Sequence, residues 1–223
     1  MVYAIWLRYN YRYMRYKYKR GPITWSPELA YVIGVIASDG NLSPDGRHIN
    51  ITSKDRGMIF TMKKLLARTS RIGKKSRGGE TEKKYYLLQF SDVLFYDFLL
   101  SIGLTPAKSK TIGPLNIPTK YFPDFLRGCI DGDGSLGYFI HPESKLPQFR
   151  IRLASASPKF LTWVLQILQK EFHIQGGFIY HTKKSASTLS FGKRDARKIL
   201  PLMYYEKSLP SLKRKRVVAE AFL

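Results

Sequence analysis

Hydrophobic positions along this chain switch between a spacing of three or four residues, typical of helices, and a spacing of two, typical of strands. From residue 27 onward the pattern predicts a helix, a β-hairpin, a second helix, a second hairpin and a third helix. These elements cover about residues 27–38, 41–52, 56–69, 74–90 and 92–102. The first half of the chain is therefore expected to follow the order αββαββα.

Capping residues support the predicted helix starts. Ser26, Asp55 and Asp92 each precede a helical pattern and can accept a hydrogen bond from the first turn. Pro27 then occupies the first helical position, where a missing N–H costs little. Gly40 follows the first helix and is expected to end it in the left-handed conformation. The boundaries thus rest on chemistry as well as on periodicity.

The second half repeats the order of the first. Its predicted elements are a helix at about 123–133, a strand at 149–153, a helix at 157–172, a hairpin over 178–183 and 188–191, and a helix at about 194–204. Phe90 and Phe191 are 101 positions apart. A repeat of about 100 residues exceeds the periods of solenoid proteins, so the sequence predicts an α+β protein containing two copies of one fold. The expected divisions are a tail at 1–22, a first half at 23–118 and a second half at 119–223.

Composition adds a large excess of positive charge. The chain has 38 Lys and Arg against 16 Asp and Glu, a formal net charge of +22, and the cations are spread along its whole length. Charge distributed in this way favours a long polyanion, most simply nucleic acid, as the partner. A ribosomal-type or merely soluble basic protein is the alternative.

Cysteine content and hydropathy limit the cellular setting. Cys129 is the single cysteine, which excludes an internal disulfide and a cysteine-rich zinc site. No apolar run approaches the roughly 20 residues of a membrane span, and no signal-peptide pattern precedes the first charges. We expect no membrane partner and an intracellular, reducing location, either the cytoplasm of a bacterium or archaeon or an organelle.

The N-terminal tail has a distinct pattern. Residues 9–20 alternate aromatic and cationic side chains. Such a segment can follow phosphates and stack on bases, or it can be a disordered leader that adds only non-specific attraction. The second interpretation is favoured because Gly21-Pro22 separates the segment from the first predicted helix.

Two apolar helices end in the same dipeptide, at Asp39-Gly40 and at Asp133-Gly134. A carboxylate is unfavourable at the C-terminal end of a helix, where the helix dipole is negative. Two such carboxylates brought together repel each other unless a cation lies between them. Mg²⁺ suits this arrangement because it binds through one or two carboxylates together with water and phosphate. The pair therefore points to a metal-dependent phosphodiesterase.

Small residues indicate that the two helices touch. Ala30, Gly34 and Ala37 lie on one face of the first helix, and Gly128 occupies the matching place in the second. Small side chains let helix backbones approach closely. Close packing would bring both helix ends, and hence both aspartates, to one place.

Two such helices at a domain-sized interval, each followed by the same element order in a very basic chain, resemble the two-motif LAGLIDADG homing endonuclease family over about residues 26–222. The resemblance implies a monomer whose two αββαββα halves form a DNA-binding saddle, with the motif helices packed at the central interface. It implies a site-specific endonuclease that cuts both strands of a long double-stranded DNA target across the minor groove, leaving short 3′ overhangs. Mg²⁺ is the implied cofactor; Mn²⁺ is expected to substitute for it, and Ca²⁺ to bind without efficient cleavage.

The resemblance also assigns roles within the site. The implied catalytic residues are Asp39, Asp133, Lys108 and Lys213, and the implied metal ligands are Asp39, Asp133 and the backbone carbonyl groups of Ser38 and Gly132. One aspartate serves each DNA strand. The two lysines, from loops that occupy matching places in the two halves, are expected to hold the solvent around the attacking water or to offset phosphate charge.

The two motifs differ in ways that predict an asymmetric site. Ala37 stands in the first motif where the second has Asp131, and we interpret that position as structural. Lys54 matches a polar family position near the site, whereas the second half has Ala156 there. The halves have diverged, as one chain that reads a non-palindromic target requires.

The predicted hairpins supply β-ribbons that fit the major groove of DNA. Arginine and glutamine can read base edges there, while lysine more often contacts phosphate. The candidate DNA-contacting residues are Arg47, Asn50, Lys54, Lys74, Arg77, Lys83, Lys84, Gln148, Arg150, Arg152, His181, Lys183 and Lys184.

Two alternative functions remain open at this point. The first is an RNA maturase that assists splicing and applies the same basic surface to intron RNA. The second is a non-cleaving DNA-binding regulator of the same fold. Both aspartates are present, which argues against the regulator but does not decide about the maturase.

Overall fold

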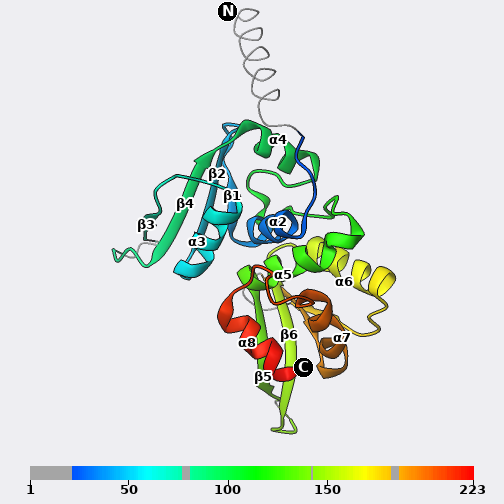
Figure 1. Ribbon diagram of the computed structural model, residues 1–223. Coiled ribbons are helices and arrows are strands. Elements are labelled where there is room, and N and C mark those ends of the chain that lie inside the picture. The colour runs from blue at the N-terminus through cyan, green and yellow to red at the C-terminus, as the bar shows by residue number, and fades with distance from the viewer. Residues whose placement is uncertain (1–21, 77–80, 142, 182–185) are drawn as a thin grey trace, which may run out of the picture.

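The computed structural model describes residues 22–76, 81–141, 143–181 and 186–223, and it forms two lobes, one above the other in Figure 1. Two helices, α2 (Pro27–Asp39) and α5 (Phe122–Asp133), cross between the lobes. The aromatic and basic segment at 9–20 lies outside the described residues, as do the candidates Arg77, Lys183 and Lys184.

The upper lobe is the first half of the chain. Its elements are α2 (Pro27–Asp39), β1 (Gly40–Leu42), β2 (His48–Ser53), α3 (Arg56–Leu65), β3 (Gly73–Lys75), β4 (Tyr85–Ser91) and α4 (Val93–Ser101). Ser26, Asp55 and Asp92 accept hydrogen bonds from the first turns of α2, α3 and α4, as their sequence positions predict. Helix α3 ends four residues earlier than expected, because Ala67 turns the chain with a φ of 48°.

The lower lobe is the second half. Its elements are α5 (Phe122–Asp133), β5 (Gly134–Ile140), β6 (Pro147–Ser155), α6 (Pro158–Phe172), β7 (Phe178–His181), β8 (Ser187–Phe191), α7 (Lys193–Met203) and α8 (Lys213–Phe222). The α+β class and the order αββαββα are confirmed for both halves. Two elements were not predicted, namely strand β5 and the terminal helix α8.

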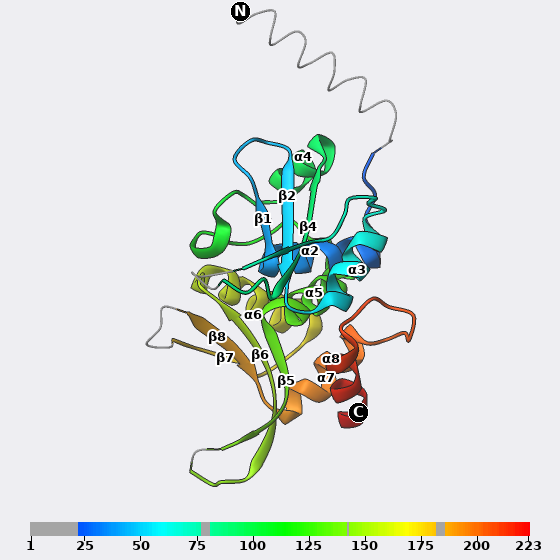
Figure 2. The ribbon, with the colours of Figure 1, turned by 90° about the vertical axis from the view of Figure 1, so that its left-hand side faces the viewer.

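Each lobe contains a four-stranded antiparallel sheet, with the orders β1-β2-β4-β3 and β5-β6-β8-β7. The inner faces are apolar: Ile49 and Ile51 in the first sheet, and Ile151 and Leu153 in the second, are buried against helices. The alternate residues of the same strands form the outer faces. In Figure 2 the sheets lie in front of the motif helices, so both outer faces are turned to one side of the molecule.

Helices α2 and α5 pack backbone against backbone at the centre. A Cβ atom added at Gly34 would lie 2.1 Å from the carbonyl oxygen of Phe125, and one added at Gly128 would lie 2.2 Å from that of Tyr31. No larger residue fits at either position without moving a helix. The close approach predicted from the small residues is confirmed.

Gly40 corrects one expectation. Its φ and ψ are −90° and 158°, so it is extended rather than left-handed. The chain passes directly from α2 into β1 and has no need of a left-handed turn. Glycine is required there for space, because an added Cβ would lie 2.6 Å from the carbonyl oxygen of Ile36. Gly134 repeats this arrangement at the end of α5.

No helix in the described part of the chain is both long enough and apolar enough to cross a membrane.

Candidate active site

The C-terminal ends of α2 and α5 meet between the two lobes (Figure 1). Asp39 is the last residue of α2 and Asp133 is the last residue of α5. Both line a cavity of about 350 Å³ that takes its walls from both halves of the chain. Its lining residues are Ala37, Ser38, Asp39, Gly40, Asn41, Thr52, Lys75, Ala107, Lys108, Ser109, Ile112, Asp133, Ser155 and Ala156.

The two helix ends interlock at the residues that precede the aspartates. A Cβ added at Gly132 would lie 2.0 Å from Ser38 Oγ and 3.4 Å from Asp39 Oδ2. The backbone of Gly132 is therefore a cradle against which the first-motif carboxylate rests. Ser38 Oγ donates to the carbonyl oxygen of Gly34 at 3.1 Å, which keeps this side chain folded onto its own helix. The structure thus brings Ser38, Asp39, Gly132 and Asp133 together.

Lys108 stands at the inner wall of this cavity. It lies in a single turn of 3₁₀-helix (Lys108–Lys110), is only 5% exposed and donates a hydrogen bond from Nζ to the carbonyl oxygen of Gly40. Burial lowers the pKa of Lys108 to about 8, and the carboxylates of Asp133 and Asp39 oppose part of that shift. An ammonium group is therefore held beside the end of α2, within electrostatic reach of both aspartates.

Lys213 is not brought to this place. It is the exposed first residue of α8 and lines a different cavity, together with Asp55 and Arg214.

Lys215 occupies the position expected for Lys213. It is 4% exposed, and its Nζ donates to the carbonyl oxygens of Ile130, Asp131 and Gly134, the last at 2.7 Å. Burial lowers the pKa of Lys215 to about 8, opposed first by Asp131 and then by Asp39 and Asp133. Since Gly134 follows α5 as Gly40 follows α2, Lys215 is the counterpart of Lys108.

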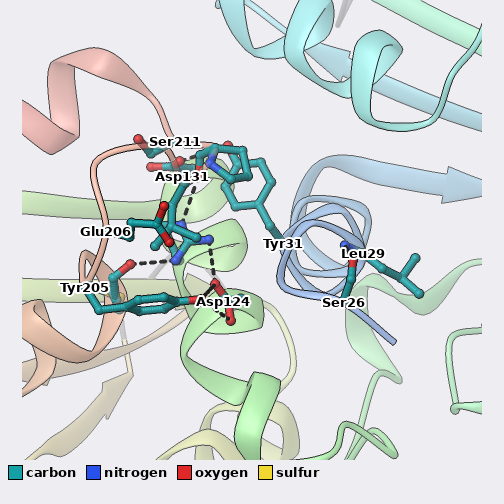
Figure 3. Close-up of polar contacts among 12 residues, drawn as sticks. Ser26, Leu29, Tyr31, Asp124, Asp131, Tyr205, Glu206 and Ser211 are labelled. Carbon is teal, nitrogen blue, oxygen red and sulfur yellow. Dashed lines mark hydrogen bonds and ion pairs between the residues drawn. The ribbon is translucent and has the colours of Figure 1, made fainter. Parts of the chain in front are cut away.

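Asp131 ties the second motif helix to its surroundings (Figure 3). Its Oδ2 accepts hydrogen bonds from Tyr31 Oη at 2.9 Å and from the backbone N–H of Leu212 at 2.7 Å. Burial raises the pKa of Asp131 and, more strongly, that of Tyr31. Leu212 is the residue that precedes α8, so Asp131 fixes the start of the helix that carries Lys215. This agrees with a structural role for the position that is Ala37 in the first motif.

A buried arginine, Arg127, belongs to the same network and was not predicted from the sequence. Arg127 has no exposed surface; it forms an ion pair with Asp124 at 2.7 Å and donates to the carbonyl oxygens of Met203 at 2.6 Å and Pro210 at 2.9 Å. Tyr205 Oη donates to Asp124 from the other side (Figure 3). The network fastens the connection between α7 and α8 to α5. The signal in the sequence was an arginine three residues after an aspartate, flanked by the apolar residues of the second motif helix.

The candidate DNA-contacting residues are placed unequally. Four of them lie on the outer faces of the sheets, because their neighbours along the strand are buried on the inner faces: Asn50, Gln148, Arg150 and Arg152. His181 is exposed at the end of β7, where its Nδ1 lies 2.7 Å from Ser187 Oγ.

In the first sheet, the structure places Lys75 rather than the predicted Lys74 on the outer face. Lys74 is exposed but pairs in register with Tyr86, and its Nζ lies 5.5 Å from the centre of that ring. Its neighbour Lys75 points to the outer side and lines the central cavity. Register determines which of two adjacent lysines faces outward, and the sequence did not reveal the register.

The remaining candidates of the first half are exposed at the edges of its sheet. Arg47 precedes β2 with its Nε 3.8 Å from Asp45, and Lys54 follows β2 with its Nζ 5.2 Å from the centre of the Tyr85 ring. Lys83 and Lys84 precede β4. Lys54 does not line the central cavity, whereas Ala156, its counterpart, does. The predicted inequality of the two halves is therefore present in the cavity wall.

Comparison with known proteins identifies the fold. Residues 26–103 match the model of the LAGLIDADG-like domain family. None of the curated proteins matches the chain by sequence. Three similar solved structures are 12% to 17% identical to this chain.

Full-length DUF199/WhiA from Thermotoga maritima has a TM-score of 0.57 at 17% identity; the match covers 91% of this chain and 63% of WhiA, so this chain spans less than two thirds of that protein. The meganuclease I-SmaMI bound to uncleaveable DNA has a TM-score of 0.58 at 12% identity, and the match covers 88% of each chain. Variants of the homing endonuclease I-DmoI have a TM-score of 0.56 at 15% identity, covering 85% of this chain and 97% of theirs. The resemblance to LAGLIDADG proteins is confirmed at the level of the fold, over both halves of the chain.

Proposed function

We propose that this protein is a monomeric, site-specific double-strand DNA endonuclease that works with a divalent metal ion. One observation carries the proposal: Asp39 and Asp133, one from each half, end two interlocked helices in a single cavity between two sheets. Two carboxylates related in this way can serve two phosphodiester bonds, one on each strand. The excess of positive charge favours the polyanionic substrate.

The residues at the helix ends fit a hard divalent cation. The donor set consists of the carboxylates of Asp39 and Asp133 and the backbone carbonyl groups of Ser38 and Gly132. All are oxygen donors, and the backbone of Gly132 lies close beside Ser38 and Asp39, since an added Cβ would lie 2.0 Å from Ser38 Oγ and 3.4 Å from Asp39 Oδ2. When bound, Mg²⁺ would supply Lewis acidity at the scissile phosphate and lower the pKa of a water molecule. We propose that Mn²⁺ substitutes and that Ca²⁺ supports binding without efficient cleavage.

The two buried lysines supply positive charge at fixed positions behind the aspartates. Near neutral pH a lysine with a pKa of about 8 is mostly protonated, so Lys108 and Lys215 can offset the negative charge that the phosphate gains. Their hydrogen bonds to carbonyl oxygens hold each ammonium group in place. Neither group must reorganise when the substrate enters.

The outer faces of the sheets extend on either side of the cavity and provide the DNA-binding surface. An antiparallel ribbon fits the major groove of B-DNA. With each sheet in a major groove, the aspartates would face the minor groove between them, so that cleavage leaves short 3′ overhangs. The similar structures of I-GzeII and I-LtrWI are complexes with target DNA. A solved variant of I-SmaMI carries alanine in place of two lysines.

The deciding experiment is cleavage of a randomised duplex library by purified full-length protein with Mg²⁺, followed by sequencing of the cut ends. We expect a defined target with a short 3′ overhang. Asp39→Asn and Asp133→Asn should each abolish the linear product while the target is still bound. Glu171→Gln, which changes an exposed acid on α6 in the same way, serves as the matched control and should cut normally.

Other results would select a different function. Sequence-specific duplex binding without cleavage under Mg²⁺ or Mn²⁺ would indicate a regulator. The absence of cleavage, together with tight binding to a structured intron RNA, would indicate a maturase. Unchanged cleavage by the double aspartate variant would refute the proposed mechanism.

A further inference from the structure

The outer faces of the two sheets have the same architecture but different chemistry. In the first sheet, Asn41, Asn50 and Gln89 stand directly opposite one another in register on β1, β2 and β4. Directly opposed residues of antiparallel strands point to the same face. The three amide side chains therefore form one row across the outer face, which we call the amide row.

No lysine or arginine occupies the outward positions of β1, β2 and β4. The other outward residues of β1, β2 and β4 are neutral apart from histidine, namely His48, Thr52, Tyr85, Leu87 and Ser91. The cations of this half lie around the row rather than in it: Lys75 on β3 lines the central cavity, Lys54 follows β2 with its Nζ over the Tyr85 ring, and Arg47 precedes β2. Within the row itself, the groups that can contact a ligand are therefore amides rather than charges.

The second sheet places arginines in the equivalent region. Arg150 and Arg152 both point outward from β6. The guanidinium carbon of Arg152 lies 3.8 Å from the centre of the Phe139 ring, and that of Arg150 lies 5.8 Å from the centre of the Phe178 ring. Stacking on aromatic rings fixes a guanidinium plane before a ligand arrives. We call these two residues the arginine pair.

Asn50 and Arg152 occupy matching positions. Gly40 and Gly134 each follow an aspartate at the end of a motif helix; the next residues, Asn41 and Ser135, pair with Asn50 and Arg152 respectively. The same point on the two sheets thus carries an amide in one half and a guanidinium in the other.

Both side chains retain unused hydrogen-bonding capacity. Asn50 Oδ1 and Arg152 Nε are shielded from solvent and have no hydrogen-bond partner within the described part of the chain. A buried polar atom without a partner costs free energy, so it is usually satisfied in the functional state. A base edge in the major groove offers a hydrogen-bond donor to Asn50 Oδ1 and an acceptor to Arg152 Nε.

The two side-chain types read different bases. Asparagine and glutamine form paired hydrogen bonds with N6 and N7 of adenine, and arginine forms them with O6 and N7 of guanine. We infer that the two halves of the DNA target differ in composition: the first sheet selects adenine at the amide row, and the second selects guanine at the arginine pair. This inference rests on the proposed DNA binding and adds which bases each half reads.

The test is a selection for binding, carried out on the full chain with a randomised duplex library in Ca²⁺ so that cleavage is not needed. We expect the selected sequences to share adenine positions in one half-site and guanine positions in the other. Asn50→Ala should lower the adenine preference by roughly 5- to 150-fold at one position. Arg152→Ala should act in the same way on guanine in the opposite half-site.

A reciprocal exchange gives a sharper readout. Asn50→Arg should convert the preference at its position from adenine to guanine, and Arg152→Asn should do the reverse. Gln166→Ala and Lys198→Ala remove an exposed amide and an exposed cation from helices α6 and α7, and as controls they should select the wild-type sequences. Thermal unfolding of each variant establishes that it is folded before the selection.

The results separate this inference from the proposed function. If the selected duplexes carry both biases but Mg²⁺ does not lead to cleavage, the endonuclease proposal fails and the inference stands. If a duplex is cut but its half-sites show no adenine and guanine bias, the inference is overturned and the endonuclease proposal stands. A uniform loss of affinity on all sequences in Asn50→Ala and Arg152→Ala would overturn it as well, because that pattern marks phosphate contacts.

Discussion

Gly128→Ala tests whether contact between the motif helices sets the geometry of the site. The added Cβ would lie 2.2 Å from the carbonyl oxygen of Tyr31, 2.9 Å from the backbone nitrogen of Val35 and 3.0 Å from Cα of Gly34. Ordinary close contacts between carbon and oxygen are about 3.3 Å. All three obstacles are backbone atoms, so α2 and α5 must separate by about 1 Å.

The magnitude follows from two opposing effects. Replacing a helical glycine by alanine favours the helix by about 0.5–1 kcal/mol. Overpacking a tight interface costs about 1–3 kcal/mol. We expect a net loss of about 1–2 kcal/mol in the free energy of unfolding, measured by urea denaturation. Gly113→Ala is the matched control, since a Cβ there meets nothing within 4 Å, and its stability should stay within about 0.5 kcal/mol of wild type.

Cleavage should respond more strongly than stability. A displacement of about 1 Å at reacting groups can cost about 100-fold in rate. We therefore expect Gly128→Ala to cut target DNA about 100-fold more slowly at a temperature where the variant is fully folded, while it still binds the target. Wild-type stability together with wild-type cleavage in Gly128→Ala would refute the argument that this contact positions the two aspartates.

Three further predictions concern the buried charges. Lys215→Met should reduce cleavage by about 100-fold, as expected for removal of a fixed charge, whereas Lys213→Met should cut nearly as well as wild type; the opposite order in plasmid cleavage assays would return the role to Lys213. The pKa values of Lys108 and Lys215 lie near 8 in the folded chain, below the ordinary 10.5. Between about pH 8 and 10.5 the unfolded chain therefore holds more protons than the folded one, and the free energy of unfolding should rise with pH over this range. Cleavage should fall above about pH 8. In Lys108→Met the stability rise measured by urea denaturation should become smaller, and an unchanged profile would contradict the assignment. Arg127→Ala should lower the free energy of unfolding by about 3–5 kcal/mol because it leaves Asp124 buried without its partner; Arg197→Ala, at an exposed site on α7, is the control, and equal losses in the two variants would show that burial of the ion pair does not matter.

The sequence predicted the element order because its signals are local. Caps such as Ser26 and Asp92 act within one turn, and the alternation around Ile49 and Ile51 is visible without knowledge of any partner. The pairing of Asp39 and Asp133 was predictable for a different reason: small residues such as Gly34 indicate that the two motif helices touch, and this contact brings the ends of both helices together.

What the sequence did not predict depends on long-range contacts. Lys215 lies within a run of four cations, and only the phase of α8 makes it face inward. Buried residues at Leu212, Lys215 and Ala219 have the spacing of a helix face, so a cation on an apolar stripe was the available signal. Strand β5 was missed because its two glycines and outward-facing aromatic residue obscure the alternation that pairing with β6 reveals.

The divergence of the two halves follows from their being in one chain. In a symmetric dimer, each substitution occurs in both subunits, so a residue such as Asp131 would also replace Ala37 in the cavity wall. In a single chain, Asp131 can accept a hydrogen bond from the N–H of Leu212 while Ala37 stays small in the wall of the central cavity. The same freedom allows Asn50 and Arg152 to differ at one structural position. The arrangement is therefore suited to a target whose two halves are unlike, and a palindromic target would leave the difference between Asn50 and Arg152 without use.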